Sequence, residues 1–186
     1  RDYTFDALYD RLGYVTQKAV LFSGTVQDNI FFGQSEAADT DETLQQALQL
    51  SQAAEFVDRY PEKASHPIAQ LGRNVSGGQK QRLSIARALA RRPEILIFDD
   101  SFSALDYKTD ATLREGLAKQ LPGTTKIIVA QRISTIRHAD QILVLDRGEI
   151  AGLGTHDALM ASCPVYREIA MSQLSEEELK KGGASK

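Results

Sequence analysis

The stretch that decides the fold runs from Asn74 to Arg82 and reads Asn-Val-Ser-Gly-Gly-Gln-Lys-Gln-Arg. The residues after it, up to Arg92, repeat small or apolar side chains at the spacing of one helix face, and Pro93 ends the pattern. Ser76 and two glycines stand where this helix begins. Backbone N–H groups at a helix N-terminus carry partial positive charge, and glycines let an anion come close to them. A glycine pair before a helix is therefore compatible with two interpretations: a simple N-cap with a flexible approach, or a helix N-terminus that binds an anion such as a nucleotide phosphate.

The composition is that of a globular domain without membrane spans. The chain has 186 residues, of which 42% are hydrophobic, enough for one domain with a core. Its net charge is -3, from 22 basic and 25 acidic residues, so bulk charge does not indicate a nucleic-acid-binding protein. No apolar run reaches the ~18 residues of a transmembrane helix, and no signal peptide is visible. The single cysteine, Cys163, excludes an internal disulfide, fits a reducing compartment and is expected to fill a small space in the core.

A second informative stretch follows the predicted helix. Residues 95–98 are four consecutive apolar residues, typical of a strand buried on both faces of a parallel sheet. Asp99 and Asp100 come directly after them. In open α/β sheets the carboxyl ends of the strands form the ligand-binding edge, so these acids are expected to face a ligand.

The remaining pattern alternates strands and helices, which indicates an α/β fold with a mostly parallel sheet. The expected elements are a strand at 12–16, a short helix at 25–31 capped by Thr25, a longer helix capped by Asp39 or Thr40, a helix at 51–60, a loop at 61–74, a helix at 107–120, a buried strand at 125–130, a strand pair at 141–145 and 149–153, a helix opened by Thr155, and a last helix at 165–174.

Several of these stretches resemble the motifs of ATP-binding-cassette (ABC) ATPases. Residues 75–79 resemble the signature loop Leu-Ser-Gly-Gly-Gln, with Val75 as a mild departure. Residues 95–100 resemble the Walker B strand, and 101–106 resemble the D-loop. Gln17 with 18–30 resembles the Gln loop of ABC exporters, whose neighbouring segment meets the coupling helices of the transmembrane domain. The resemblance implies a P-loop NTPase-like sheet core with an inserted α-helical subdomain.

The resemblance also assigns roles to single residues. ABC domains dimerise head to tail, so the signature residues of one chain serve the ATP of its partner. Mg²⁺ and the attacking water are contacted from the chain that holds the ATP. The implied sites are Asp99 and Gln17 for the metal; Asp100, Gln131 and Gln17 for catalysis; Ser76, Gly77, Gly78 and Gln79 for the partner's ATP; and Ser103 and Asp106 in the D-loop, which crosses to the partner domain.

One motif of the family does not occur in the sequence. The phosphate-binding loop Gly-x-x-x-x-Gly-Lys-Ser/Thr is absent, and in the family it lies upstream of the Gln loop. We therefore expect a fragment that begins after this loop and is inactive alone. Its expected domain covers 1–174, with the Gln loop and helical subdomain in 18–74, the core in 75–174, and a polar, disordered tail at 175–186.

Two positions depart from the family pattern of an active site. The residue after the Walker B aspartate is usually the glutamate that acts as general base, and here it is Asp100. Its carboxylate is drawn back by one carbon–carbon bond, roughly 1.5 Å, and misplacement of ~1 Å can cost on the order of 10²-fold in rate. The family's switch histidine is replaced by Gln131, which cannot carry a charge near neutral pH.

This combination resembles one half of bacterial heterodimeric multidrug exporters, in which one ATP site is degenerate. The implied partners are a second ABC domain and a transmembrane domain in the same full-length chain, at the cytoplasmic face of the cell membrane, and no nucleic acid. Two alternatives remain: a homodimeric exporter with an active site, and a soluble ABC ATPase acting on DNA or the ribosome. Other residues receive structural interpretations. We expect no zinc site at His66, His138 or His156, and a solvated helix face from Lys80, Arg82, Arg87, Arg91 and Arg92.

Overall fold

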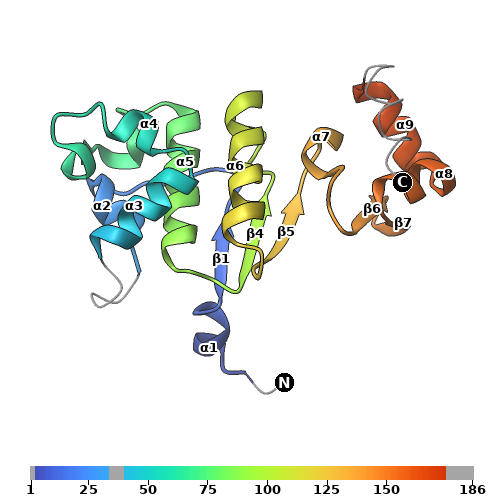
Figure 1. Ribbon diagram of the computed structural model, residues 1–186, viewed down its shortest axis with the longest axis horizontal. Helices are drawn as coiled ribbons and strands as arrows, with labels where there is room; N and C mark the ends of the chain where they lie inside the picture. Colours follow the sequence, from blue (N-terminus) through green and yellow to red (C-terminus); the bar gives the residue numbers. More distant parts are fainter. Residues whose placement is uncertain (1–2, 34–39, 175–186) are drawn as a thin grey trace. The chain divides into compact units, whose positions relative to one another are not determined.

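The computed structural model describes residues 3–33 and 40–174, so the expected tail at 175–186 lies outside the described residues. The chain divides into two compact units, Arg1–Val129 and Ala130–Lys186, which are described separately (Figure 1). No helix within the described ranges combines the length and the apolar character needed to cross a bilayer.

A parallel sheet forms the core of the first unit. Its strands are β1 (Leu12–Val15), β4 (Ile95–Asp99) and β5 (Thr125–Val129), in the spatial order β1-β4-β5. Both pairings are parallel, with β4 in the centre. The parallel α/β core predicted from the sequence is therefore confirmed.

The expectation that β4 and β5 are buried on both faces is wrong. In β4, Leu96 and Phe98 are fully buried, whereas the alternate residues are only partly covered. In β5, Ile127 and Val129 are 49% and 53% exposed. In both strands the better-covered residues alternate with the more exposed ones, so one face of the sheet is covered more completely than the other.

Two long helices pack with this sheet. The predicted phosphate-binding helix is α5 (Gly77–Ala90), and α6 (Tyr107–Gln120) follows β4 with the bounds expected from the sequence. Helix α5 buries residues on nearly every side, because it lies between the sheet and a lobe of short helices (Figure 1). It is therefore a central element of the unit, where the sequence predicted only one apolar face.

The lobe contains α2 (Val26–Ile30), α3 (Asp41–Leu50) and α4 (Ala54–Val57). Thr25 caps α2 in a capping box with Asp28, and Thr40 caps α3. Asp39, the alternative cap, lies outside the described residues. Helix α4 is shorter than the expected 51–60. It begins only after Gln52, whose φ of 62° separates it from the preceding helix, and it ends at Val57.

Two segments differ from the expected loop and coil. A short helix, α1 (Phe5–Tyr9), precedes β1 and was not predicted. The expected loop at 61–74 contains the 3-10 turns η2 (Lys63–Ser65) and η3 (Gln70–Gly72), and the two-residue strand β3 (Pro67–Ile68). Strand β3 pairs antiparallel with β2 (Gly24–Thr25). The composition of residues 61–74 indicates only turns, and the sequence did not reveal this pairing because its partner strand lies about 40 residues earlier in the chain.

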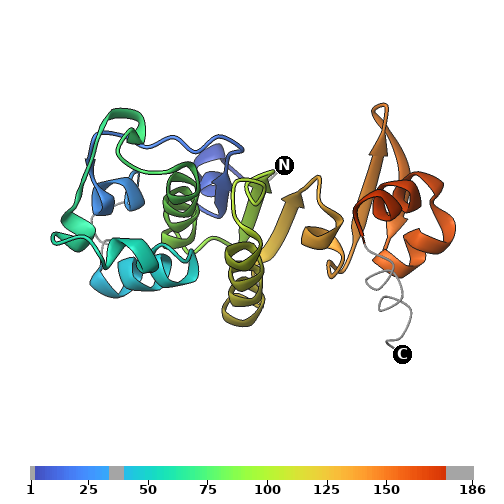
Figure 2. The same cartoon turned by 90° about the horizontal axis from the view of Figure 1, so that it is seen from above.

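The second unit is a hairpin covered by helices, visible at the orange and red end of the chain (Figure 2). It consists of α7 (Ile133–Ile136), β6 (Ile142–Asp146), β7 (Glu149–Gly154), α8 (His156–Ser162) and α9 (Pro164–Gln173). The hairpin turns at Arg147 and Gly148 with φ values of 49° and 84°, the left-handed pair that suits the twist of a hairpin. Cys163 is buried in the core of this unit, as predicted.

A buried histidine makes the stability of this second unit dependent on pH. His156 Nδ1 lies 2.8 Å from the hydroxyl of Tyr166, and both side chains are buried. Burial, and then the charge of Arg137, lower the pKa of His156, whereas Asp157 opposes them. The unfolded chain therefore binds the proton more readily than the folded one. The stabilisation is complete above the ordinary histidine pKa of about 6.5 and is lost as the pH falls below it.

We expect amide hydrogen exchange in residues 142–174 to accelerate as the pH is lowered from about 7.5 to about 5.5, after correction for the intrinsic rate. His156→Gln is the control, because glutamine can bond the Tyr166 hydroxyl without titrating in this range. Equal pH dependence in the two proteins would contradict the role assigned to His156.

Candidate functional site

Three of the predicted site residues meet at the carboxyl edge of the parallel sheet. Asp99 ends β4 and Asp100 follows it, and Gln17 follows β1, the strand paired with β4 in parallel register. Gln17 Nε2 donates a hydrogen bond to Asp100 Oδ2 at 3.0 Å. The hydroxyl of Tyr14 donates to Asp99 Oδ2 at 2.9 Å, and this bond raises the pKa of Tyr14. The adjacency of the two strands therefore places all three residues in one polar cluster.

The backbone holds Asp100 in a constrained position. Its φ is 47°, in the left-handed region, and its N–H donates to the carbonyl of Val129 at 3.0 Å. The next residue, Ser101, is fully buried and donates through Oγ to the carbonyl of Val15 at 3.1 Å. Because contacts to both neighbouring strands hold this turn, the Asp100 carboxylate has little freedom to move forward by backbone adjustment.

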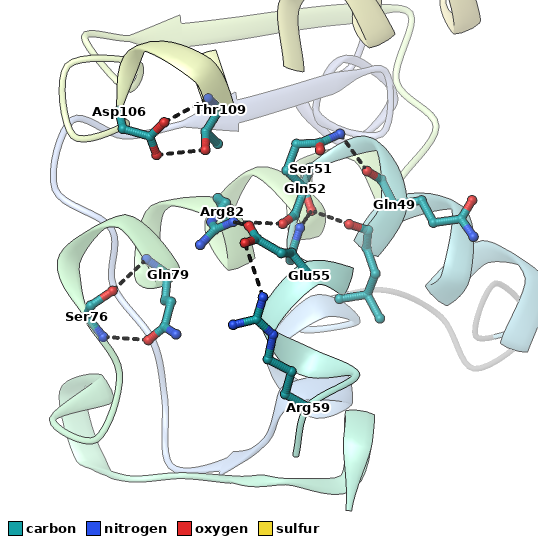
Figure 3. A network of polar contacts seen from close by, with 12 residues as sticks. Gln49, Ser51, Gln52, Glu55, Arg59, Ser76, Gln79, Arg82, Asp106 and Thr109 are labelled. Atoms are coloured by element: carbon teal, nitrogen blue, oxygen red, sulfur yellow. Dashed lines mark hydrogen bonds and ion pairs between the residues drawn. The ribbon is translucent and has the colours of Figure 1, made fainter. Parts of the chain in front are cut away.

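The predicted D-loop begins at this turn and ends as a helix cap. Ser103 Oγ donates to the carbonyl of Asp100 at 2.7 Å. Asp106 accepts from Thr109 N at 2.9 Å and from Thr109 Oγ1 at 2.7 Å, which lowers the pKa of Asp106 (Figure 3). The D-loop is therefore anchored at both ends, and Asp106 has a structural role that the sequence analysis did not assign.

The signature residues form a capping box at the start of α5. Ser76 Oγ accepts from the N–H of Gln79 at 3.2 Å, and Gln79 Oε1 accepts from the N–H of Ser76 at 2.8 Å (Figure 3). The N–H groups of Gly77 and Gly78 come next, in the first turn, where a helix has no intrahelical acceptors for them. A Cβ added to Gly77 would meet nothing within 4 Å, whereas one on Gly78 would lie 3.5 Å from the carbonyl of Ala104 in the D-loop. The tip at Gly77 is thus open to an external ligand.

A buried glutamine links the signature helix to the Gln loop. Gln81 is 1% exposed, and its Nε2 donates to the carbonyl of Thr16 at 3.1 Å. Thr16 directly precedes Gln17. None of the sequence motifs points to Gln81. The available signal was a polar side chain on a helix that is otherwise buried, which implies a satisfied hydrogen bond.

The expected solvated face of basic residues on α5 is wrong. Arg82 donates to the carbonyl of Gln52 at 2.9 Å and to Glu55 Oε2 at 2.8 Å (Figure 3). Its guanidinium also lies over the ring of Phe56. Arg87 and Arg91 bond backbone carbonyls of the lobe. These side chains face the lobe because α5 is covered on that side, which helix periodicity alone does not reveal.

Gln131 belongs to the second unit. Its carbonyl accepts from Gln173 Nε2 at 2.8 Å, and Gln173 Oε1 accepts from the N–H of Ile133 at 2.9 Å. The side chain of Gln173 on α9 therefore holds the backbone on both sides of Arg132 in place. The catalytic role of Gln131 stays a prediction.

A comparison with protein-family models matches residues 2–103 to the family described as "ABC transporter". The chain belongs to the ABC transporter family. An uncharacterized ABC transporter ATP-binding protein of Mycobacterium tuberculosis is 45% identical over 174 residues, covering 93% of this chain and 30% of the relative. The probable multidrug resistance ABC transporter ATP-binding/permease protein YheI of Bacillus subtilis is 44% identical over 88% of this chain and 28% of the relative. The chain thus spans about 30% of the length of such relatives.

A solved structure of a bacterial Atm1-family ABC exporter with ATP bound superimposes with a TM-score of 0.87 at 36% identity, covering 93% of this chain and 30% of that one. The α/β fold of an ABC ATPase domain, predicted from the motifs, is confirmed. In an ABC domain, the cluster at the sheet edge has the donor chemistry for Mg²⁺, which prefers carboxylate oxygens completed by phosphate and water. The described residues contain no group of three or more His, Cys, Asp or Glu that could hold a metal by itself.

Proposed function

We propose that this chain is part of the nucleotide-binding domain of an ABC exporter of multidrug or lipid type, in which ATP binding and hydrolysis drive export across the membrane. The relative named as a probable multidrug resistance transporter and the likeness to an ABC exporter support this assignment. The partners are a transmembrane domain of the full-length protein and a second ABC domain. The ATP-binding domain then faces the cytoplasm of a bacterial cell.

The two groups of site residues serve different nucleotides in this proposal. Asp99 and Gln17 act on this chain's own ATP and its Mg²⁺, and Mg²⁺ supplies charge neutralisation on the phosphates. Ser76, Gly77, Gly78 and Gln79 bind the terminal phosphate of the partner's ATP. The open tip at Gly77 supports this second role, since the free space there lets an external phosphate reach the helix N-terminus.

Asp100 carries the assignment of a degenerate site in a heterodimer. Its side chain is short, and its carboxylate is hydrogen-bonded to Gln17. The side chain ends one carbon–carbon bond earlier than that of the usual glutamate, roughly 1.5 Å. Its Oδ2 accepts a hydrogen bond from Gln17 Nε2 at 3.0 Å. A general base must reach the proton that it abstracts. Asp100 therefore activates water poorly, and Gln131 at the switch position adds no charge to compensate.

The test uses the assembled full-length transporter with both ABC domains. We expect Asp100→Ala to lower total ATP turnover by less than about 2-fold, because a base that is out of reach contributes little. We expect Ser76→Ala to lower turnover at least about 10-fold, because it acts at the other ATP site.

Ser76→Ala also removes a helix cap, at a cost of about 1 kcal/mol in stability. Thr40→Ala is the control for the loss of a cap, since the Thr40 side chain likewise accepts from the N–H three residues later and Thr40 is not one of the proposed nucleotide-binding residues. A large loss of turnover from Asp100→Ala would show an active site at this position, as in a homodimeric exporter, and would sink the degenerate assignment.

A further inference from the structure

Two aromatic rings form an exposed pair on the surface of the lobe. Phe22 and Phe32 stack with their centroids 4.3 Å apart and an angle of 21° between the rings. Their side chains are 42% and 53% exposed, so a large part of both rings faces the surface. Phe22 lies in the segment after Gln17, and Phe32 follows α2. The pair therefore joins the Gln loop to the lobe.

Arg87 on α5 lies beneath this pair and bonds the same two segments. Its Nε donates to the carbonyl of Asn29 at 2.7 Å, its Nη2 to Asn29 Oδ1 at 3.1 Å, and its Nη1 to the carbonyl of Val20 at 3.0 Å. The guanidinium carbon lies 5.5 Å from the ring centroid of Phe22 and 5.8 Å from that of Phe32. One planar cation therefore holds both segments and both rings.

Asn29 completes the arrangement from the lobe. It is 1% exposed, and its Nδ2 donates to the carbonyls of Phe22 and Thr25 at 2.9 and 3.0 Å. Its Oδ1 accepts from the N–H of Phe22 at 2.8 Å as well as from Arg87. Burial lowers the pKa of the Arg87 guanidinium, so this charge is kept in place against a desolvation cost. A lysine has no fork of donors and cannot make the same three bonds.

We propose that the contacts of Arg87 hold the Phe22–Phe32 pair in a fixed position relative to the signature helix. When nucleotide binds at Ser76 and Gly77, the aromatic pair and the signature loop then move together as a rigid unit. Ser76 caps the helix that carries Arg87, and this helix is continuous from Gly77 to Ala90. Arg87 is a positioning residue in this scheme, because it touches neither nucleotide nor metal. The inference deepens the proposed export function and rests on it, since that function requires nucleotide events to reach the transmembrane domain through the surface beside the Gln loop.

The first test measures, by amide hydrogen exchange in the full-length protein, how strongly Arg87 stabilises the segment that carries Phe22 and Phe32. In Arg87→Lys we expect residues 20–33 to exchange at least about 10-fold faster, while residues 77–90 keep their rates. Arg91→Lys is the matched control at the C-cap of α5. Arg91 makes a single hydrogen bond to this segment, to the carbonyl of Gly33, and one lysine donor suffices for that bond, so residues 20–33 are expected to keep their exchange rates. Unchanged exchange at 20–33 in Arg87→Lys, or equal acceleration at 77–90, would overturn the proposal.

The second test measures transmission in the assembled transporter, by spin-label distances across the transmembrane domain with and without ATP. We expect Arg87→Lys to keep ATP affinity within about 2-fold and to lose most of the ATP-driven distance change. Phe32→Leu should do the same, and the double variant should be no worse than the worse single one, because both act through one contact. Additive losses would count against the proposal. An unmodified assembly without any ATP-driven change would refute the export function, while hydrogen exchange would still decide the role of Arg87.

Discussion

Gly77→Asp is expected to lower the ATP turnover of the assembled transporter at least about 100-fold, the scale of losing a preorganised electrostatic contact at a reacting phosphate. The new carboxylate would occupy the open space at the tip of α5, where a Cβ meets nothing within 4 Å. It would repel the phosphate that this helix N-terminus is proposed to bind. The measurement is steady-state ATP hydrolysis at saturating Mg-ATP.

The same substitution is expected to leave the fold intact or to strengthen it. An acidic residue in the first turn of a helix is favourable by about 0.3–1 kcal/mol, so thermal unfolding should not shift to lower temperature. Gly123→Asp is the matched control, since Gly123 also has no atom within 4 Å of an added Cβ and lies in the turn after α6. Full turnover in Gly77→Asp would refute the proposed contact with the partner's nucleotide.

Asp100→Glu is expected to raise hydrolysis at this chain's own site on the order of 10²-fold, because it moves the carboxylate forward by about one bond length. The contribution of the other site must first be silenced by replacing its general base. Single-site turnover of this background, with and without Asp100→Glu, is then the measurement. In the unmodified protein the Asp100 carboxylate accepts a hydrogen bond from Gln17 at 3.0 Å.

Asp100→Gln separates length from basicity in this experiment. Glutamine extends as far as glutamate but cannot accept a proton near neutral pH, so it should give no increase. An equal rise in both variants would mean that side-chain length alone affects the site through packing. No rise with glutamate would place the defect elsewhere than at Asp100.

Much of the fold could be predicted because it depends on neighbours in the sequence. Helix α6 has its predicted bounds, and the caps at Thr25 and Ser76 were anticipated, because a cap needs only a side chain and an N–H group three residues later. The predicted start of α4 was wrong, because Gln52 adopts a left-handed backbone conformation in a segment whose composition favours a helix.

The candidate site was predicted in part. Asp99, Asp100 and Gln17 were assigned from their motifs, and the structure brings them together because β1 and β4 are neighbours. The bonds of Tyr14 to Asp99 and of Gln81 to Thr16 were missed. They join residues 85 and 65 positions apart, and no local pattern indicates which distant group a polar side chain will meet.

The sequence by itself determined the family, the parallel α/β core and the signature helix with its open N-terminus, since motif and period are properties of consecutive residues. The tertiary structure alone decided what α5 does with its basic side chains. Arg87 has the spacing of a surface residue, yet its guanidinium donates hydrogen bonds to the carbonyls of Val20 and Asn29, which lie 67 and 58 positions away. Whether a charge on a helix meets water or a carbonyl depends on which element covers that face, and this is settled only when the chain packs.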